Sequence, residues 1–233
     1  MYGFFFDPMY LLFAMPALLL AMFAQWKVSS AYAKYTKVRN ARNITGVQAA
    51  DYLLRANGLN LSVSGTPGQL TDHYDPRDKT LYLSQGVAQT PSVASLAIVA
   101  HEVGHAVQDS QGYAPMRFRA FLVAPASIGP WVGYIMFIIG IFLNFAGLVW
   151  LGIVFFSASL IFALATLPVE INASQRALAM LRSSALVGQG EVDAAQSVLT
   201  AAALTYVAAA AQALSTLLYY VFVALNFGGR RRN

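Results

Sequence analysis

Cysteine is absent from this 233-residue chain, and charged residues make up only 11% of it. Without cysteine the chain forms neither a disulfide framework nor a thiolate metal site, so any bound metal must be held by histidine and carboxylate side chains. Ordinary soluble domains carry about 25% charged residues. Together with a hydrophobic content of 58%, the scarcity of charge favours a membrane protein whose partner is the lipid bilayer.

The few charges are gathered in blocks that flank apolar segments. Residues 27–119 hold ten Lys and Arg against six Asp and Glu, and the whole chain has a formal net charge of +5. Because the cations border apolar segments, they are read as a signal of membrane topology and not of nucleic-acid binding. We therefore expect residues 27–119 on the cytoplasmic side of the membrane.

The first apolar segment, residues 8–26, carries no charge. Its length is about what one helix needs to cross a bilayer. A cleaved signal peptide is the alternative, but that would have positive charge before the apolar stretch and small residues after it. Here Asp7 precedes the segment and a series of cations follows. We expect a retained anchor with its N-terminus outside; the cations are Lys27, Lys34, Lys37, Arg39 and Arg42.

The second apolar segment has no charged residue between Arg119 and Glu170. One crossing needs about 20 residues, so this length predicts two crossings, near 124–143 and 148–167. Pro130 is the expected start of a helix, and residues 144–147 are the expected turn. A buried helical hairpin of a soluble protein is the alternative, which the length and the lack of charge disfavour.

The third apolar segment, residues 194–229, is also uncharged. It predicts one crossing near 206–227, preceded by an alanine-rich helix. This crossing would place the basic tail, residues 230–232, outside the cell, against the positive-inside tendency. A re-entrant segment or a tight hairpin over residues 194–229 is therefore the alternative.

The polar segment contains signals for several short elements. We expect a basic interfacial helix at 29–41 and a helix at 46–57 that Thr45 caps. Alternation at period two predicts a strand at 80–84. As an exposed edge strand it would bind an extended peptide by strand addition, and an ordinary strand of a small sheet is the alternative.

The sequence His101-Glu102-Val103-Gly104-His105 lies in an apolar run of helical periodicity, residues 92–108, with Thr90 and Pro91 as the expected helix start. Residues i and i+4 of a helix project from the same face, so the two imidazoles can bind one divalent ion. This is the H-E-x-x-H arrangement of zinc hydrolases. Chance placement on an ordinary amphipathic helix is the alternative. It is disfavoured because the chain has only three histidines.

A catalytic zinc usually takes three protein ligands, so one more is needed. An even number of crossings returns the chain to the side of the membrane that it left, which brings residues after 168 back to the histidines. Glu170, at the start of an expected helix over 170–182, is our choice for the third ligand. Glu191 is the other glutamate left. The alternative role for Glu170 is a helix N-terminal acid stabilised by the helix dipole.

Three segments, His73–Arg77, Ala100–Asp109 and Leu167–Ser174, resemble the YugP-type neutral zinc metallopeptidases of bacterial membranes. The third also resembles the E-x-x-A-D element of HtpX-like and CAAX prenyl endopeptidases, whose glutamate is a zinc ligand. This resemblance implies a gluzincin-like enzyme with Glu170 as ligand. Ser174 stands where the element has aspartate, so a weaker neutral hydrogen bond would replace a carboxylate that braces a ligating histidine.

The expected chemistry is peptide hydrolysis with one Zn²⁺ on His101, His105 and Glu170, and with Glu102 as general base. Asp109 and Ser174 are candidates to orient the ligating histidines; an exposed surface acid is the alternative for Asp109. Four further residues are candidates for stabilising the oxyanion or positioning substrate, with a structural role as the alternative for each: His73, Tyr74, Tyr113 and Arg176.

The fold class expected is a mainly α integral membrane protein with about four transmembrane helices and a cytoplasmic, zincin-like α+β catalytic domain bearing a short β-sheet. Its substrates would be peptides or membrane proteins. A catalytically inactive, metal-binding membrane adaptor is the alternative, and a metal transporter is a third possibility that the distance of the histidines from the nearest span disfavours. The expected parts are an anchor at 1–26, the catalytic domain at 27–120, a transmembrane hairpin at 121–168, a third-ligand helix and loop at 169–197, and a transmembrane helix with basic tail at 198–233.

Overall fold

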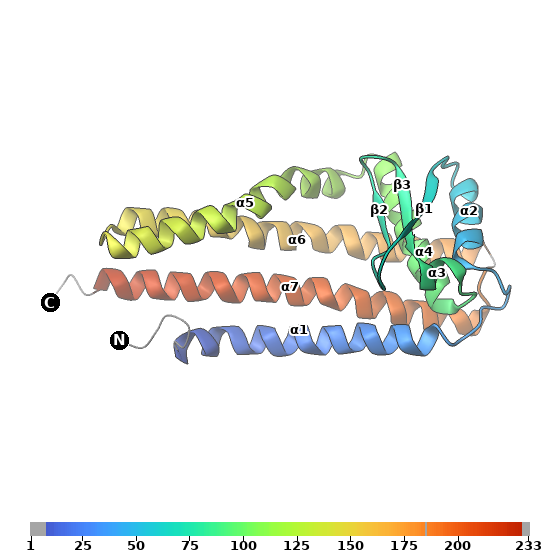
Figure 1. Ribbon diagram of the computed structural model, residues 1–233, viewed down its shortest axis with the longest axis horizontal. Coiled ribbons are helices and arrows are strands. Elements are labelled where there is room, and N and C mark those ends of the chain that lie inside the picture. Colours follow the sequence, from blue (N-terminus) through green and yellow to red (C-terminus); the bar gives the residue numbers. More distant parts are fainter. Residues whose placement is uncertain (1–7, 185, 230–233) are drawn as a thin grey trace. The chain divides into compact units, whose positions relative to one another are not determined.

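The computed structural model describes residues 8–184 and 186–229. Asp7 and the basic tail at 230–232, on which part of the expected topology depends, lie outside these residues. The described chain is mainly helical with one small sheet, as expected (Figure 1). Its elements are α1 (Pro8–Tyr35), α2 (Gly46–Ala56), β1 (Ser62–Thr66), β2 (His73–Asp75), β3 (Thr80–Ser84), α3 (Gln85–Gln89), α4 (Val93–Ser110), α5 (Ala114–Phe142), α6 (Ala146–Ser183) and α7 (Gln189–Gly229).

Helices α1, α5, α6 and α7 are long and apolar enough to cross a membrane. The prediction of about four membrane helices is therefore confirmed at the level of length and composition. The described chain divides into two compact units. One, here the apolar unit, comprises residues 8–23, 117–167 and 205–229; the other, here the sheet unit, comprises residues 24–116 and 168–204. The domain boundaries drawn from the sequence stay predictions.

In the apolar unit, α5 ends at Phe142 and α6 begins at Ala146, and Asn144 between them has a φ of 53°. The predicted turn at 144–147 is confirmed in its first half, and its second half belongs to α6. The two helices pack closely through Gly133 and Gly152. A Cβ atom on either glycine would lie 2.6 Å from the carbonyl oxygen of the other, so this contact requires glycine on both sides. Pro130 does not start a helix; it lies inside α5, because membrane helices tolerate internal proline.

Two other helices are longer than expected. The predicted crossing at 148–167 and the predicted helix at 170–182 form one helix, α6, with Pro168 inside it. Helix α7 is also continuous, which removes the hairpin alternative for residues 194–229. The prediction of a separate interfacial helix at 29–41 is wrong, because α1 continues without a break to Tyr35.

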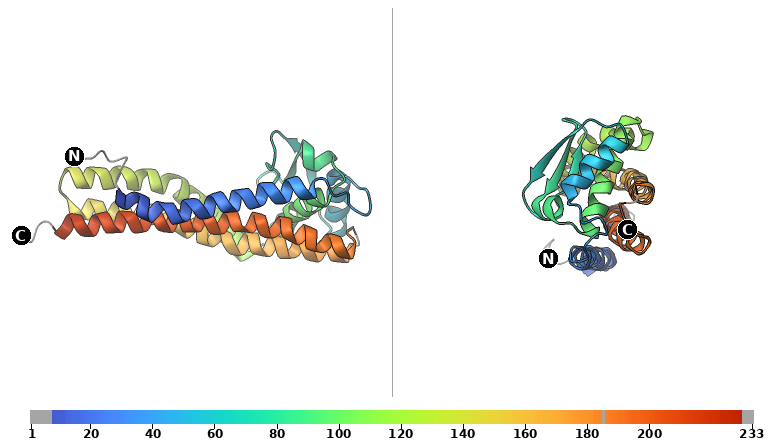
Figure 2. Two further views of the ribbon diagram at one scale, coloured as in Figure 1. Left: turned by 90° about the horizontal axis from the view of Figure 1, so that it is seen from below. Right: turned by 90° about the vertical axis from the view of Figure 1, so that its right-hand side faces the viewer.

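The sheet has the strand order β1-β3-β2, with β1 parallel and β2 antiparallel to β3. The predicted strand at 80–84 is confirmed as β3. It is the central strand, however, so strand addition at an exposed edge is wrong for this segment. The edges are β1 and β2, and β2 was not predicted. Figure 2 shows the three strands in the sheet unit, close to α2.

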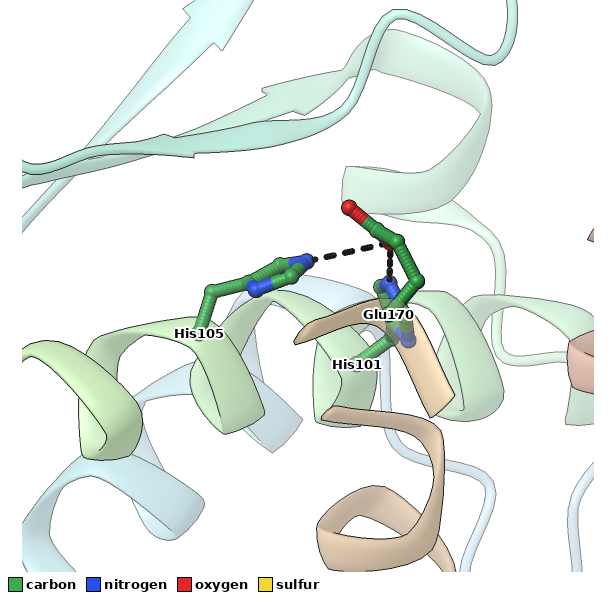
Figure 3. A group of neighbouring side chains, drawn as sticks. All are labelled: His101, His105 and Glu170. Carbon is green, nitrogen blue, oxygen red and sulfur yellow. Dashed lines mark hydrogen bonds and ion pairs between the residues drawn. The ribbon is translucent and has the colours of Figure 1, made fainter. Parts of the chain in front are cut away.

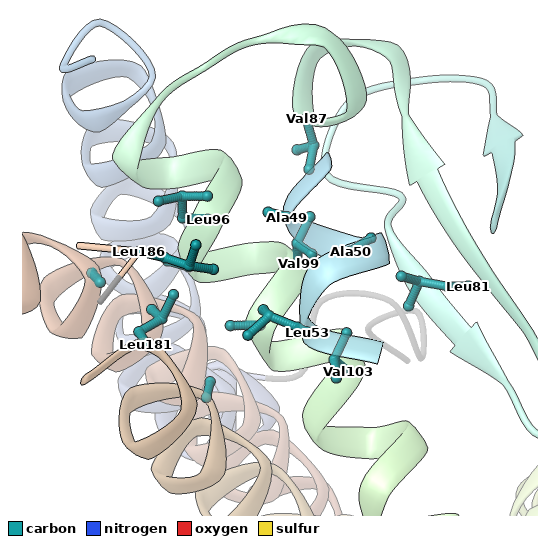
Figure 4. Close-up of a cluster of buried hydrophobic side chains, with 14 of the residues drawn as sticks. Ala49, Ala50, Leu53, Leu81, Val87, Leu96, Val99, Val103, Leu181 and Leu186 are labelled. Atoms are coloured by element: carbon teal, nitrogen blue, oxygen red, sulfur yellow. The ribbon is translucent and has the colours of Figure 1, made fainter. Parts of the chain in front are cut away.

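Helix α4 forms the centre of the sheet unit. Its apolar side chains Leu96, Val99 and Val103 are fully buried; Val99 and Val103 lie next to α2, and Leu96 lies on the side of Leu186 (Figure 4). The helix begins later than Thr90 and Pro91 suggested, because a second short helix, α3, precedes it and Ser92 is its N-cap, accepting a hydrogen bond from Ser95 N–H. Thr45 caps α2 as predicted, in a capping box with Gln48.

Candidate metal centre

The structure brings His101, His105 and Glu170 together. The two histidines project from successive turns of α4, and Glu170 approaches them from α6 (Figure 3). Oε2 of Glu170 lies 3.2 Å from Nε2 of His101 and 3.5 Å from Nε2 of His105. One ligand atom from each residue lies within 4.8 Å of the others, so the group can hold a metal ion. Two imidazole nitrogens and one carboxylate oxygen are donors that suit zinc.

The close approach of α6 to α4 depends on Gly104, between the two histidines. A Cβ atom there would lie 2.8 Å from the carbonyl oxygen of Ala173. Because the missing side chain leaves room for the α6 backbone, Glu170, one turn earlier on α6, reaches the imidazoles. The other glutamate considered, Glu191, accepts hydrogen bonds from the backbone N–H groups of Ala41 and Gly188, at 2.8 and 2.7 Å.

Glu102 lies on α4, as the two histidines do, and is buried. Its Oε2 accepts a hydrogen bond of 3.0 Å from the backbone N–H of Tyr74 in β2. Burial raises the pKa of the Glu102 carboxyl, and the two neighbouring histidines and, to a smaller extent, the backbone hydrogen bond from Tyr74 oppose that rise. Strand β2, which was not predicted from the sequence, thus holds the Glu102 carboxylate next to the two histidines.

Each histidine of the group also has a polar partner at Nδ1. Ser174 Oγ lies 3.2 Å from Nδ1 of His101, and Gln108 Oε1 lies 3.0 Å from Nδ1 of His105. Burial alone would lower the pKa of His105, but the neighbouring carboxylates of Glu170 and Glu102 outweigh burial and raise it. Ser174 was a candidate for this contact, whereas Gln108 was not.

Two of the weaker candidates, Asp109 and Tyr74, bond to each other. The Tyr74 hydroxyl donates to Asp109 Oδ2 at 2.6 Å, and the Lys79 ammonium donates to the same oxygen. Burial raises the pKa of the Tyr74 hydroxyl, and the hydrogen bond to Asp109 raises it further. The Tyr74 side chain therefore joins β2 to α4, and its backbone is what reaches Glu102.

The remaining candidates lie in two places. The His73 ring stacks on Tyr82 in the sheet, with ring centroids 4.8 Å apart. The Arg176 guanidinium lies 5.9 Å from the centre of the Tyr113 ring and donates to Asn172 at 2.7 Å. Arg176 and Asn172 both belong to α6, close in sequence to Glu170, and Arg176 also donates to Gln111 at the end of α4 at 2.8 Å. Roles for His73, Tyr113 and Arg176 in substrate binding stay predictions.

Sequence reasoning missed two residues of this centre, Gly104 and Gln108. Both signals were present. A glycine inside a helix costs about 1 kcal/mol relative to alanine, so its presence between two candidate ligands indicates a close neighbour. Gln108 is a polar residue in an apolar helix, three positions after His105 and hence on the same face.

A mainly helical chain with four candidate membrane spans and a group of two histidines and a glutamate on packed helices defines a class of membrane-associated metalloprotein. The particular family follows from comparison: residues 10–225 match the family described as "Putative neutral zinc metallopeptidase", and the chain belongs to that family. It is 38% identical over 226 residues to the "Putative membrane protease YugP" of Bacillus subtilis (strain 168), covering 97% of this chain and 100% of that protein. No solved structure matches the chain. The resemblance to the YugP-type metallopeptidases is confirmed.

Proposed function

We propose that this chain is a zinc-dependent metallopeptidase of the bacterial inner membrane that hydrolyses peptide bonds at the membrane surface. One observation carries the proposal. His101, His105 and Glu170 present one ligand atom each within 4.8 Å of one another, with the buried carboxylate of Glu102 on the same helix. Family membership supports the assignment to zinc and to peptide hydrolysis.

His101, His105 and Glu170 would hold a single Zn²⁺, which supplies Lewis-acid polarisation of the scissile carbonyl and lowers the pKa of coordinated water. The Nδ1 partners of the two imidazoles, Ser174 and Gln108, orient the rings. This arrangement leaves Nε2 of each imidazole toward Glu170.

Glu102 is the proposed general base. Its Oε2 is bonded to the Tyr74 amide, so we assign proton transfer to Oε1, which would take a proton from the attacking water and deliver it to the leaving amine. Burial raises the pKa of the Glu102 carboxyl, and a carboxylate with a raised pKa is a stronger base than an ordinary one.

The excess of Lys and Arg in residues 27–119 supports a cytoplasmic site. The substrates proposed are peptides and membrane proteins. The three metal-site residues belong to the sheet unit. This favours hydrolysis over metal transport, in which the ligands would be expected among the apolar spans.

The test is Glu102→Gln in the full-length protein purified in detergent, with fluorescently labelled casein as substrate and metal analysis on the same sample. We expect loss of proteolysis with zinc retained at one ion per chain. Glu170→Ala should lose both zinc and proteolysis. Glu191→Gln is the matched control, because it changes a glutamate outside the metal group, and it should keep zinc and activity.

Two results would count against the proposal. Wild type that binds zinc but cleaves neither casein nor membrane-protein substrates would favour the inactive, metal-binding adaptor. Wild type that binds no zinc would exclude the metal centre altogether.

A further inference from the structure

Gln108 is fully buried, with no exposed side-chain surface, and its amide makes three hydrogen bonds. Nε2 donates to the carbonyl oxygen of Val169 at 2.8 Å and to Oδ1 of Asn172 at 3.0 Å, and Oε1 lies 3.0 Å from Nδ1 of His105. The side chain thus touches α4 and α6 at once, beside the metal group.

The direction of each of these bonds is fixed by its partners. The Val169 carbonyl can only accept, so the amide nitrogen of Gln108 must face it. Arg176 Nε can only donate, and it donates to the same Asn172 oxygen at 2.7 Å, so that oxygen also accepts. Both amide hydrogens of Gln108 are then committed to α6.

The remaining atom, Oε1 of Gln108, can only accept. Nδ1 of His105 must therefore carry a hydrogen and donate it. In a neutral imidazole this puts the lone pair on Nε2, the atom that faces Glu170. The amide of Gln108 thereby selects the tautomer of His105 that is able to bind a metal ion.

The same side chain also fixes α6. Val169, whose carbonyl accepts from Gln108, directly precedes Glu170 in the sequence. One planar amide group, that of Gln108, therefore holds both His105 on α4 and Val169, the neighbour of Glu170, on α6. The effect on the third ligand is through the backbone, and Gln108 itself need not touch the metal.

We propose that Gln108 is a positioning residue that sets the tautomer of His105 and keeps Glu170 in register with the histidine pair. This inference rests on the proposed metal site. It assigns to one buried amide the coupling between the two helices that supply the ligands. Outer hydrogen bonds of this kind change metal affinity by about 10–100-fold.

The test compares the zinc affinity of full-length wild type and Gln108→Met, measured by competition with a chelator in detergent. Methionine is of similar length and offers the bonds of neither amide atom. We expect affinity to fall about 10–100-fold. Asn40→Leu is the control: Asn40 is another buried amide of the sheet unit, 3% exposed, and its side chain bonds the backbone of Ile44. It should lose stability without a change in zinc affinity.

A second readout is the spectrum of the zinc-loaded protein labelled with ¹⁵N-histidine, which is simple because the chain has three histidines. In wild type, the Nδ1–H of His105 should be present and protected from exchange with solvent. In Gln108→Met the protection should be lost. If that variant does not fold, Gln108→Asn serves, because the shorter amide cannot span from His105 to Val169.

Three results would overturn the inference. The first is a folded Gln108→Met, or Gln108→Asn in its place, that binds zinc within threefold of wild type and keeps the protected Nδ1–H. The second is an equal loss of affinity in Asn40→Leu, which would make the effect a general loss of stability. The third is a wild type that binds no zinc, in which case the proposed function fails as well; the first two leave the proposed function standing.

Discussion

The backbone N–H of Tyr74 donates a 3.0 Å hydrogen bond to the buried carboxylate of Glu102. Tyr74, a residue of the edge strand β2, thereby holds the proposed general base, while its own hydroxyl is bonded to Asp109 on α4. The side chain of Tyr74 connects strand and helix, and the backbone orients the carboxylate. Substitution of the hydroxyl therefore tests how much the position of Glu102 depends on this connection.

Tyr74→Phe should lower kcat for casein about tenfold and leave zinc content unchanged. Removal of the hydroxyl also leaves Asp109 with one fewer donor, so we expect a loss of about 1–2 kcal/mol in the free energy of unfolding. Tyr82→Phe is the control, because that hydroxyl donates to the exposed Asp78 at 2.7 Å. Steady-state kinetics, metal analysis and thermal unfolding check the prediction. Equal kinetics for the two variants would contradict it.

Gly104→Ala should separate the two helices that supply the metal ligands. The added Cβ would lie 2.8 Å from the Ala173 carbonyl oxygen, and backbone of α6 cannot move aside without also moving Glu170. Overpacking of this kind costs about 1–3 kcal/mol of stability. We expect zinc affinity to fall at least about tenfold, as it does when ligand orientation is lost.

The control for Gly104→Ala is Gly65→Ala in β1, where an added Cβ would meet nothing within 4 Å. Its zinc affinity and thermal unfolding should match those of wild type. If Gly104→Ala behaved like Gly65→Ala, the close approach of α4 and α6 would have no part in metal binding.

Ser174 gives a prediction in the opposite direction. Its hydroxyl lies 3.2 Å from Nδ1 of His101, at the position where the E-x-x-A-D element that residues 170–174 resemble has aspartate. Ser174→Asp should raise zinc affinity severalfold, because a charge-assisted hydrogen bond is about twice as strong as a neutral one. Ser174→Ala should lower it up to about tenfold. Chelator competition measures both, and the prediction fails if aspartate weakens binding more than alanine does.

Removal of the metal should lower stability by an amount that depends on zinc concentration. A ligand present at 100 times its dissociation constant adds about 2.7 kcal/mol. We therefore expect 1,10-phenanthroline to lower the midpoint of thermal unfolding of wild type. Glu170→Ala should show no such shift, whereas Glu191→Gln should keep it. A shift of equal size in Glu170→Ala would mean that the chelator acts elsewhere.

Much of the site could be predicted because its signals are local. Two histidines at i and i+4 share a helix face whatever surrounds them, and an uncharged stretch of two crossing lengths returns the chain to its starting side. Together with the need for a third zinc ligand, these two observations led to the choice of Glu170 as the partner of His101 and His105. The alternation of residues at period two in Thr80–Ser84 was likewise a local signal, and it predicted strand β3 correctly.

Features that depend on contacts between distant segments were harder to predict. Pro130 lies inside α5 because apolar helices accept proline, contrary to the rule for soluble helices. Strand β2 has only three residues and is followed by a turn signal, so it shows no periodicity. The role of Gln108 depends on Val169 and Asn172, which lie more than 60 positions away in the sequence.

Strand β2 pairs with β3 on one side only. Because the Tyr74 N–H is given to Glu102, it is turned away from β3, at a border of the sheet that would otherwise be open to a second chain. The carboxylate of Glu102, the proposed general base, thus also occupies the Tyr74 N–H at the outer edge of β2. A polypeptide that lined up along β2 by main-chain pairing would have to compete with Glu102 for this N–H, so capture of such a polypeptide and release of the base would be a single event.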